Sequence, residues 1–423
     1  MTEDQEEINE ITSLTEPNKA IHYFWLGFII TTVNYTLMVC YSTPNKTFIY
    51  FQILGILILV SASLKLVKFN IKNKYLKTVF ILYLIWAAIT VLRGFSMNKD
   101  YLMIFLVNAY SGIFLYLAPL ILLIPLNLIY IKKLFNTIIV INIIYLLCSL
   151  FFIGQLLGSD SESGQQILEN LARFLSIPCG FILLLNSYQS KGRNIIPLIT
   201  LLLTLLFAVA RARRGLLFVT LNIGVFSFLF YYYANKGNLL KRFLPLALLP
   251  FFLVYASKFV ETNKTNFLGN LYDRLDEDTR SGVVECYLLD MGSNDWLIGR
   301  GINGEYFCPL FPDSNTDYRD SIENDFLQII LKGGIVSLGI LLLIGIPAAI
   351  KGLFFSNNLL SKAAGLWIIF WIVNMYPTTV TAFSLNYLIV WMCFGICFSP
   401  EIRRMPDDTI KDFLQNYSTK LLV

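Results

Sequence analysis

Long apolar stretches separated by short polar segments follow one another along most of this chain. The hydrocarbon core of a bilayer is about 30 Å thick, and an α-helix of about 20 apolar residues can cross it. By this measure the sequence predicts an all-α polytopic integral membrane protein with about twelve transmembrane helices. Their expected ranges are 21–41, 47–67, 75–93, 102–125, 134–157, 171–188, 194–211, 214–234, 243–260, 326–350, 359–376 and 378–399.

The composition agrees with this prediction. Of the 423 residues, 56% are hydrophobic and 14% are charged, whereas an average soluble domain has about 25% charged residues. So few charges could not cover the surface of a soluble protein of this length, which excludes a soluble enzyme, a nucleic-acid-binding domain and a disordered chain. The single histidine, His22, excludes a zinc site built on paired histidines, and the seven cysteines have no metal-ligand spacing.

Lysine and arginine residues fall mainly in alternate loops, which predicts the orientation of the chain. Basic loops are cytoplasmic in most membrane proteins. The basic segments are 65–77, 132–133, 191–193, 236–242, 351–362 and 403–404, whereas the intervening loops are polar or acidic. The sequence therefore predicts that both termini are cytoplasmic. The first twenty residues are acidic and polar, which is not the pattern of a signal peptide.

These observations divide the chain into five predicted parts. A cytoplasmic N-terminal tail (1–20) precedes transmembrane helices one to nine (21–260). A large extracytoplasmic segment (261–325), here called the long loop, leads to the last three helices (326–399) and a cytoplasmic C-terminal tail (400–423).

An arginine-rich turn interrupts the apolar sequence between the predicted seventh and eighth helices. The residues are Arg211-Ala212-Arg213-Arg214-Gly215, and no Asp or Glu lies between positions 171 and 260. A buried arginine costs about 2.5–3.5 kcal/mol on insertion scales, so we expect a turn near the outer surface. Guanidinium groups bind phosphate through two parallel hydrogen bonds. The turn therefore predicts an anion site for a lipid phosphate or diphosphate; the alternative is an ordinary basic loop, which the topology rule disfavours on this face.

The long loop is rich in carboxylates, and Arg280 and Arg300 are among its few basic residues. Residues 283–291 have helical apolar spacing, and Gly333-Gly334 beyond the loop predicts close helix packing or a kink. Cys286 and Cys308 would be able to form a disulfide if they lie close together, which the sequence does not decide. The acidic run 276–278 is either a solvated segment or a divalent-cation site.

Three elements then occur in a specific order. Arg214-Gly215 opens a helix, Arg280 precedes the segment WLIGRG at 296–301, and Glu323-Asn324 precedes a helix containing Gly333-Gly334. This order resembles that of the O-antigen ligase and O-antigen polymerase (Wzy-type) superfamily. The motif resemblance covers about residues 205–340, and the remainder agrees in topology alone.

The resemblance implies a glycosyltransferase with GT-C-like architecture in the bacterial inner membrane, with its active site facing the periplasm. It implies undecaprenyl-diphosphate-linked oligosaccharides as donor and acceptor, a chain-length regulator as a candidate partner, no nucleic acid, and neither cofactor nor metal. Ligases of the family typically have a histidine where this chain has Glu323. The departure favours a polymerase, which joins lipid-linked repeat units, over a ligase that transfers glycan to lipid A-core.

In this interpretation Arg214 and Arg280 stabilise the leaving diphosphate, and Glu323 accepts or orients the proton of the attacking hydroxyl. The expected substrate-binding residues are Arg211, Arg213, Asn324 and Arg300. A lipid-linked oligosaccharide flippase or other transporter is the alternative from another class. Such a carrier would be expected to have charges along its membrane helices, which are nearly uncharged here.

Overall fold

The computed structural model describes residues 19–41, 46–157, 162–234, 281–309 and 316–416. It is mostly helical (79%), as expected for an all-α membrane protein. Within these ranges the strands are β1 (Tyr306–Phe307) and β2 (Tyr318–Arg319), which pair antiparallel in the long loop.

Seven helices in the described ranges are long and apolar enough to cross a membrane. They are α2 (Lys19–Cys40), α3 (Lys46–Leu66), α4 (Lys74–Arg93), α7 (Leu128–Phe151), α11 (Lys191–Ala210), α12 (Arg214–Ala234) and α17 (Asp325–Phe354). Three shorter apolar helical stretches are Ile113–Leu123, α18 (Leu359–Asn374) and α19 (Leu385–Phe398). The predicted span 243–260 lies outside the described residues. The count of twelve spans and the GT-C-like architecture therefore stay predictions.

The predicted span 134–157 is divided at Phe152 between α7 and a short helix, Ile153–Leu157. Three further predicted spans are not continuous helices. The range 102–125 is divided into α5 (Lys99–Val107), α6 (Ile113–Leu117) and the 3-10 helix η1 (Ala118–Leu123). The range 171–188 contains a π-helical segment η2 (Ala172–Ser176), α10 (Cys179–Leu184) and the 3-10 turn η3 (Asn186–Tyr188). In the range 378–399, helix α19 begins only at Leu385.

Local hydrogen bonding accounts for the break between α5 and α6. The side-chain oxygen of Asn108 accepts hydrogen bonds from the backbone N–H groups of Tyr110 (2.7 Å) and Ser111 (3.2 Å). Such a turn competes with the hydrogen bonds of a continuing helix. Pro119 is then the second residue of η1, where its missing N–H is tolerated. These polar contacts therefore interrupt the apolar segment 102–125, which hydrophobicity alone predicts to be one helix.

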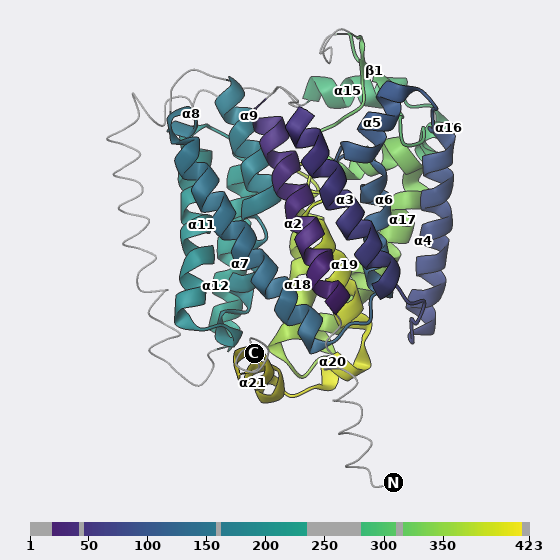
Figure 1. Cartoon of the computed structure of the whole chain (residues 1–423). Helices are drawn as coiled ribbons and strands as arrows, with labels where there is room; N and C mark the ends of the chain where they lie inside the picture. The colour runs from purple at the N-terminus through teal and green to yellow at the C-terminus, as the bar shows by residue number, and fades with distance from the viewer. Residues whose placement is uncertain (1–18, 42–45, 158–161, 235–280, 310–315, 417–423) are drawn as a thin grey trace.

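The helices stand side by side in one bundle with different elements at its two ends (Figure 1). One end has α8 (Ile153–Leu157), α9 (Glu162–Leu171), α15 (Ser281–Asp290), α16 (Ser293–Ile298) and the β1–β2 hairpin. We call this the long-loop end. The opposite end, called the tail end, has α20 (Pro400–Arg404) and α21 (Asp407–Asn416). Segments predicted to be outside therefore lie together, whereas their periplasmic location stays a prediction.

The long loop has a small apolar core of its own. Tyr287 of α15 and Met291, the residue after this helix, pack with Tyr306 of β1 and with Ile330 and Leu331 of α17. Helix α15 confirms the helical spacing predicted for residues 283–291. Cys286 and Cys308 form a disulfide that joins α15 to the residue after β1. The described part of the loop is therefore an ordered unit packed on the first turns of α17.

A kink in α17 receives the glycine-rich part of the long loop. Gly334 has φ 72° and ψ 179°, which breaks the helix and confirms the kink predicted at Gly333-Gly334. The carbonyl oxygens of Leu331 and Lys332 accept hydrogen bonds from Arg300 N (2.7 Å) and Gly301 N (2.9 Å). The loop therefore satisfies backbone groups that the broken helix no longer pairs.

Candidate functional site

The arginine-rich turn joins α11 to α12 at the long-loop end, where it lies with the other segments predicted to be outside. Helix α11 ends at Ala210 and α12 begins at Arg214. Ala212 has φ 51°, a left-handed conformation that is uncommon for a residue with a side chain. This conformation reverses the chain within three residues and brings Arg211, Arg213 and Arg214 together at one corner of the bundle.

Arg211 is buried and connects the turn to α8 and α9. Its Nε donates a hydrogen bond to the carbonyl oxygen of Leu156 (3.0 Å), and its side chain is 5% exposed. Its guanidinium lies against Gly164 of α9, where an added Cβ would be 2.4 Å from Nη2. Only a glycine at position 164 allows this approach without displacement of the arginine.

Glu169 lies between two arginines from different elements. Its Oε1 accepts a hydrogen bond from Arg173 Nη2 (2.8 Å), and its Oε2 is 3.5 Å from Arg213 Nη2. Arg173 belongs to η2, within the predicted span 171–188. The sequence reasoning did not assign a role to Arg173 or Glu169, although a single arginine within an apolar stretch is itself a signal of function.

Arg173 also contacts two further elements. Its Nη1 donates to the hydroxyl oxygen of Tyr110 (3.0 Å), and its Nη2 lies 3.4 Å from the hydroxyl of Thr378. Asp325 is close enough to interact with it electrostatically. Arg173 therefore lies at the meeting point of the break after α5, the segment before α19 and the start of α17.

Asp325 is the first residue of α17 and is fully buried. One of its carboxylate oxygens accepts hydrogen bonds from the backbone N–H groups of Val380 and Thr381, both at 2.6 Å. Its own N–H donates to the carbonyl oxygen of Met375 (2.8 Å). Asp325 thus holds the non-helical segment 375–384, which explains why α19 begins later than predicted.

We call Arg173, Arg211, Arg213 and Arg214 the arginine cluster. Arg214 is half-buried at the first position of α12, directly after Arg213. Among the residues that the structure describes, Glu169, whose side chain is 36% exposed, contacts Arg173 and Arg213, and the buried Asp325 interacts electrostatically with Arg173. Arg173 and Arg213 thus share the carboxylate of Glu169, and guanidinium groups of this kind are suited to binding the oxygens of an anion.

Glu323 and Asn324 immediately precede Asp325. Glu323 is exposed, and Asn324 is the N-cap of α17, with its Oδ1 accepting from Phe326 N (3.0 Å) and Leu327 N (3.3 Å). The cap occupies the oxygen of the Asn324 amide, so a contact with a substrate would come from its Nδ2 group. Both predicted site residues therefore directly precede Asp325, which interacts electrostatically with Arg173 of the arginine cluster.

Arg300, predicted to bind substrate, contacts other parts of the long loop. Its guanidinium donates to the carboxylates of Asp290 and Asp295 and to the carbonyl oxygens of Asp290 (2.6 Å) and Glu305 (2.7 Å). Burial alone would lower the pKa of Arg300, but the hydrogen bonds to the two aspartates outweigh it and raise that pKa. None of these contacts involves the arginine cluster. Arg280 and the acidic run 276–278 lie outside the described residues.

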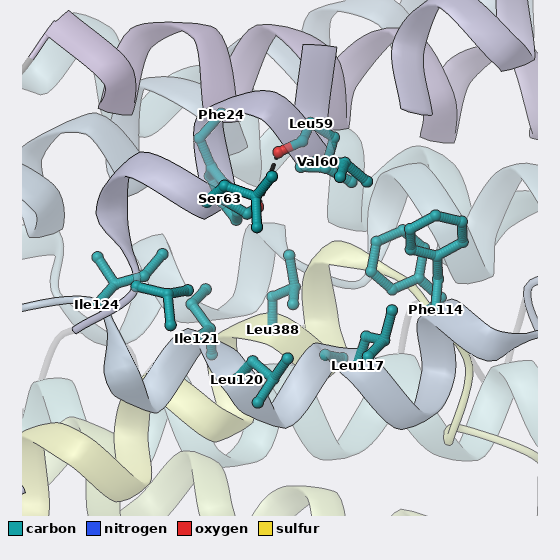
Figure 2. A pocket seen from close by; sticks show the side chains of 14 residues that line it. Phe24, Leu59, Val60, Ser63, Phe114, Leu117, Leu120, Ile121, Ile124 and Leu388 are labelled. Atoms are coloured by element: carbon teal, nitrogen blue, oxygen red, sulfur yellow. Dashed lines mark hydrogen bonds between the residues drawn. The ribbon is translucent and has the colours of Figure 1, made fainter. Parts of the chain in front are cut away.

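An apolar groove of about 490 Å³ opens between α2, α3, the α6–η1 stretch and α19. Figure 2 shows Leu59 and Val60 on one side and Leu117, Leu120 and Ile121 on the other. The hydroxyl of Ser63 in the groove donates to the carbonyl oxygen of Leu59 (2.7 Å). The groove is therefore lined almost entirely by hydrocarbon. Its full lining is Phe24, Leu59, Val60, Ser63, Leu64, Val67, Phe114, Leu117, Ala118, Leu120, Ile121, Ile124, Phe383 and Leu388.

Two segments connect this groove with the arginine cluster. Phe114 and Phe383 line the groove. Phe114 follows Tyr110, whose hydroxyl contacts Arg173, and Phe383 follows Thr378, which contacts the same guanidinium. The polar and apolar parts of the site are thus built from the same two breaks in the helices.

A smaller pocket of about 70 Å³ lies between α4, residues 110–116 and α17, with room for a few water molecules. Its lining is polar and aromatic and includes Tyr83, Gln328 and Lys332. Tyr110 and Thr381 also line it; Tyr110 contacts Arg173, and Thr381 contacts Asp325. The pocket therefore adjoins the arginine cluster from the side of α17.

No match was found to a protein-family model, to a curated protein or to a solved structure. Within the described ranges, no group of three or more His, Cys, Asp or Glu residues is arranged to hold a metal ion. The functional interpretation therefore depends on the sequence pattern and the geometry of this site.

The arrangement combines three chemical environments: the arginine cluster and Glu323 lie at the long-loop end, and the groove extends from Phe114 and Phe383 toward the tail end. The arginine cluster is suited to phosphate oxygens, the groove to a hydrocarbon chain, and the exposed Glu323 to accepting a proton or orienting a hydroxyl. A molecule with an anionic group attached to a long apolar chain would match the first two environments together.

Proposed function

We propose that this protein is a surface-polysaccharide polymerase of the bacterial inner membrane. It would transfer a polyprenyl-diphosphate-linked oligosaccharide to a sugar hydroxyl of another lipid-linked repeat unit. The observation that carries the proposal is the arginine cluster, which lies at the long-loop end of an apolar bundle and shares two chain segments with an apolar groove.

The reaction requires stabilisation of a leaving diphosphate. The hydroxyl oxygen of the acceptor attacks the anomeric carbon, a new C–O bond forms, and the bond to the diphosphate breaks with its electron pair on the leaving oxygen. Guanidinium groups fixed near that oxygen stabilise the developing charge more than the ground state. We assign this role to Arg214 and Arg213, with Arg173 behind them; Arg280 keeps its predicted role.

The apolar groove would receive part of the isoprenoid chain of the donor. Its volume of about 490 Å³ lies in the range of ligand pockets. Burial of apolar chain in such a groove contributes affinity in proportion to the area covered. Within a membrane this gain is measured against the lipid tails that the chain displaces, so the groove serves mainly to orient the diphosphate toward the arginines.

The acceptor hydroxyl needs a group that takes its proton. Glu323 is exposed beside the start of α17, where a sugar can approach from solvent. We assign it as the proton acceptor and the Nδ2 group of Asn324 as a hydrogen-bond donor to the sugar. Asp325 is buried and holds the segment 375–384, so we assign it a positioning role.

Two observations favour this function over its alternatives. Glu323 stands where ligases of the resembled family have a histidine, which favours polymerisation over transfer to lipid A-core. A carrier would need charged groups along its membrane helices. The buried charges of α17, Asp325 and Lys332, both lie in its first eight residues at the long-loop end. That placement supports a reaction at the long-loop end of the bundle over transport through it.

The purified full-length protein, reconstituted with a polyprenyl-diphosphate-linked repeat unit, tests the proposal directly. The expected products are a lipid-linked dimer of repeat units and one free polyprenyl diphosphate per bond formed. Arg214→Ala should abolish both products, whereas Arg404→Ala, an exposed arginine of α20 at the tail end, should leave them unchanged. Product formation by Arg214→Ala at the wild-type rate would refute the role of the cluster.

A further inference from the structure

We propose that Glu169 is an exchangeable counter-ion of the arginine cluster, which the entering diphosphate displaces from Arg173 and Arg213. This inference rests on the proposed function, because it assigns the diphosphate of the donor to that cluster. It adds a residue that competes with the substrate for its binding groups. The cation site would thus be neutralised by the protein itself until a strong anion arrives.

The carboxylate of Glu169 divides its two oxygens between two arginines. Its contact with Arg173 is 2.8 Å, within the range of a charge-assisted hydrogen bond, whereas its contact with Arg213 is longer, at 3.5 Å. A diphosphate has several anionic oxygens and carries more charge than one carboxylate. It can therefore form two short contacts where Glu169 forms one.

Arg173 does not depend on Glu169 for its position. Tyr110 and Thr378 contact the same guanidinium from other elements, and the Tyr110 ring lies 5.4 Å beneath its central carbon. These contacts persist when the carboxylate moves away. The cation is thus pre-organised for an incoming anion, which lowers the cost of binding.

The exposures of the three side chains place the carboxylate on the accessible side. Glu169 is 36% exposed, Arg213 is 26% exposed and Arg173 is 16% exposed. An anion that arrives from solvent would therefore meet the carboxylate before the guanidinium behind it. Displacement moves Glu169 toward water, where its charge is solvated at little cost.

The simpler interpretation is that Glu169 and Arg173, which are four residues apart, stabilise a helix by an ordinary ion pair. That interpretation does not account for Arg213, which belongs to a different part of the chain. It also makes an opposite prediction. A purely structural Glu169 would leave anion affinity unchanged or reduced when replaced, because Arg173 would lose its orientation.

Binding of inorganic pyrophosphate and of geranylgeranyl diphosphate to the purified full-length protein in detergent tests the exchange. The variant Glu169→Gln keeps the size of the side chain and removes its charge. We expect it to bind both probes about tenfold more tightly than the wild type, the scale of one charge-assisted hydrogen bond. Glu285→Gln, an exposed carboxylate of α15, makes the same change in net charge and should bind as the wild type does.

A double-mutant cycle separates competition from a general charge effect. In the Arg213→Ala background, Glu169→Gln should gain less affinity than in the wild type, since one of the two contested guanidinium groups is absent. Equal, weaker or undetectable binding by Glu169→Gln, or an equal gain in Glu285→Gln, overturns the inference. If Glu169→Gln binds diphosphate more tightly but no variant makes polymer, the exchange stands and the polymerase assignment fails.

Discussion

The carbonyl oxygen of Leu297 lies where a side chain on Gly334 would have to be. A Cβ added at Gly334 would be 2.1 Å from that oxygen, and the φ of 72° is itself strained for any residue with a Cβ. The kink of α17 and the glycine-rich part of the long loop therefore require each other. The same loop residues lead toward Glu323 and the start of α17.

Gly334→Ala should destabilise the protein by at least about 1–3 kcal/mol from backbone strain alone. The steric conflict with Leu297 adds to this cost. The measurement is thermal unfolding of the purified protein in detergent. Gly339→Ala, in the same helix and facing open space, is the matched control and should unfold at the wild-type temperature. Equal unfolding temperatures for both variants would mean that the loop does not fill the kink.

Gly164→Ala should displace Arg211 and reduce polymer formation by about 10²-fold, the effect expected for a misplacement on the scale of 1 Å. The reason is that the new Cβ would lie 2.4 Å from the guanidinium of Arg211 and 2.4 Å from the carbonyl oxygen of Gln155 in α8, which is less able to move than the end of a side chain. Rates of polymer formation in membranes, normalised to protein amount, give the measurement. Gly154→Ala, in the neighbouring α8 with no atom within 4 Å of its Cβ, serves as control. A normal rate for Gly164→Ala would contradict the importance of the Arg211 position.

Cys286→Ser should reduce stability by about 2–4 kcal/mol, since it removes the disulfide that closes the loop to Cys308. In the wild type, the thiols of Cys286 and Cys308 should become accessible to a thiol reagent only after reduction of the denatured protein. Non-reducing gels of alkylated protein make this visible. Rapid alkylation of both cysteines without a reductant would show that the disulfide is absent.

Orientation is tested with one new cysteine at each end of the bundle. Ser293→Cys, exposed at the start of α16, should react with a membrane-impermeant thiol reagent in intact spheroplasts. Lys411→Cys, exposed on α21, should react only after the membrane is opened. The reverse pattern would place the arginine cluster in the cytoplasm and remove the basis of the proposed function.

Glu323→Gln should reduce the rate of polymer formation by about 10²–10⁴-fold, the usual contribution of general acid–base catalysis. The substitution keeps the shape of the side chain and removes its ability to accept a proton. Asp317→Asn, another exposed carboxylate of the long loop, is the control. Polymer of normal amount and length from Glu323→Gln would mean that a group other than Glu323 accepts the proton of the acceptor hydroxyl.

In a Gram-negative host that attaches the glycan to lipid A-core, a deletion strain distinguishes polymerase from ligase. Loss of a polymerase should leave core capped by a single repeat unit. Bare core together with long lipid-linked chains would instead identify a ligase. Gel profiles of the surface polysaccharide separate the two results.

The sequence predicted those features that depend on composition and local pattern. Apolar length was sufficient for α3 and α4, and the pair Gly333-Gly334 was sufficient for the kink. The breaks at Asn108 and before Leu385 were missed, because hydropathy does not register a side chain that replaces a helical hydrogen bond. The second break depends on Asp325, more than fifty residues earlier in the chain.

The candidate site was predicted in part for a similar reason. Arg211, Arg213 and Arg214 stand out because they are adjacent in an apolar region. Glu169 and Arg173 were not assigned, since their relation to Arg213 exists only after the chain between them has folded. The structure places Arg300 among Asp290 and Asp295, a set of contacts that residue spacing alone did not indicate.

The segment that Asp325 holds between α18 and α19 has a consequence for the depth at which a substrate would meet the protein. With 16 and 14 residues, α18 starts and α19 ends at the tail end, and both fall about 6–9 Å short of the hydrocarbon thickness. The turn between them therefore lies below the headgroup plane of the opposite leaflet. A lipid-linked diphosphate could reach Arg173 while its carrier remains within the leaflet, so that the sugar moves toward the protein and the lipid is never extracted.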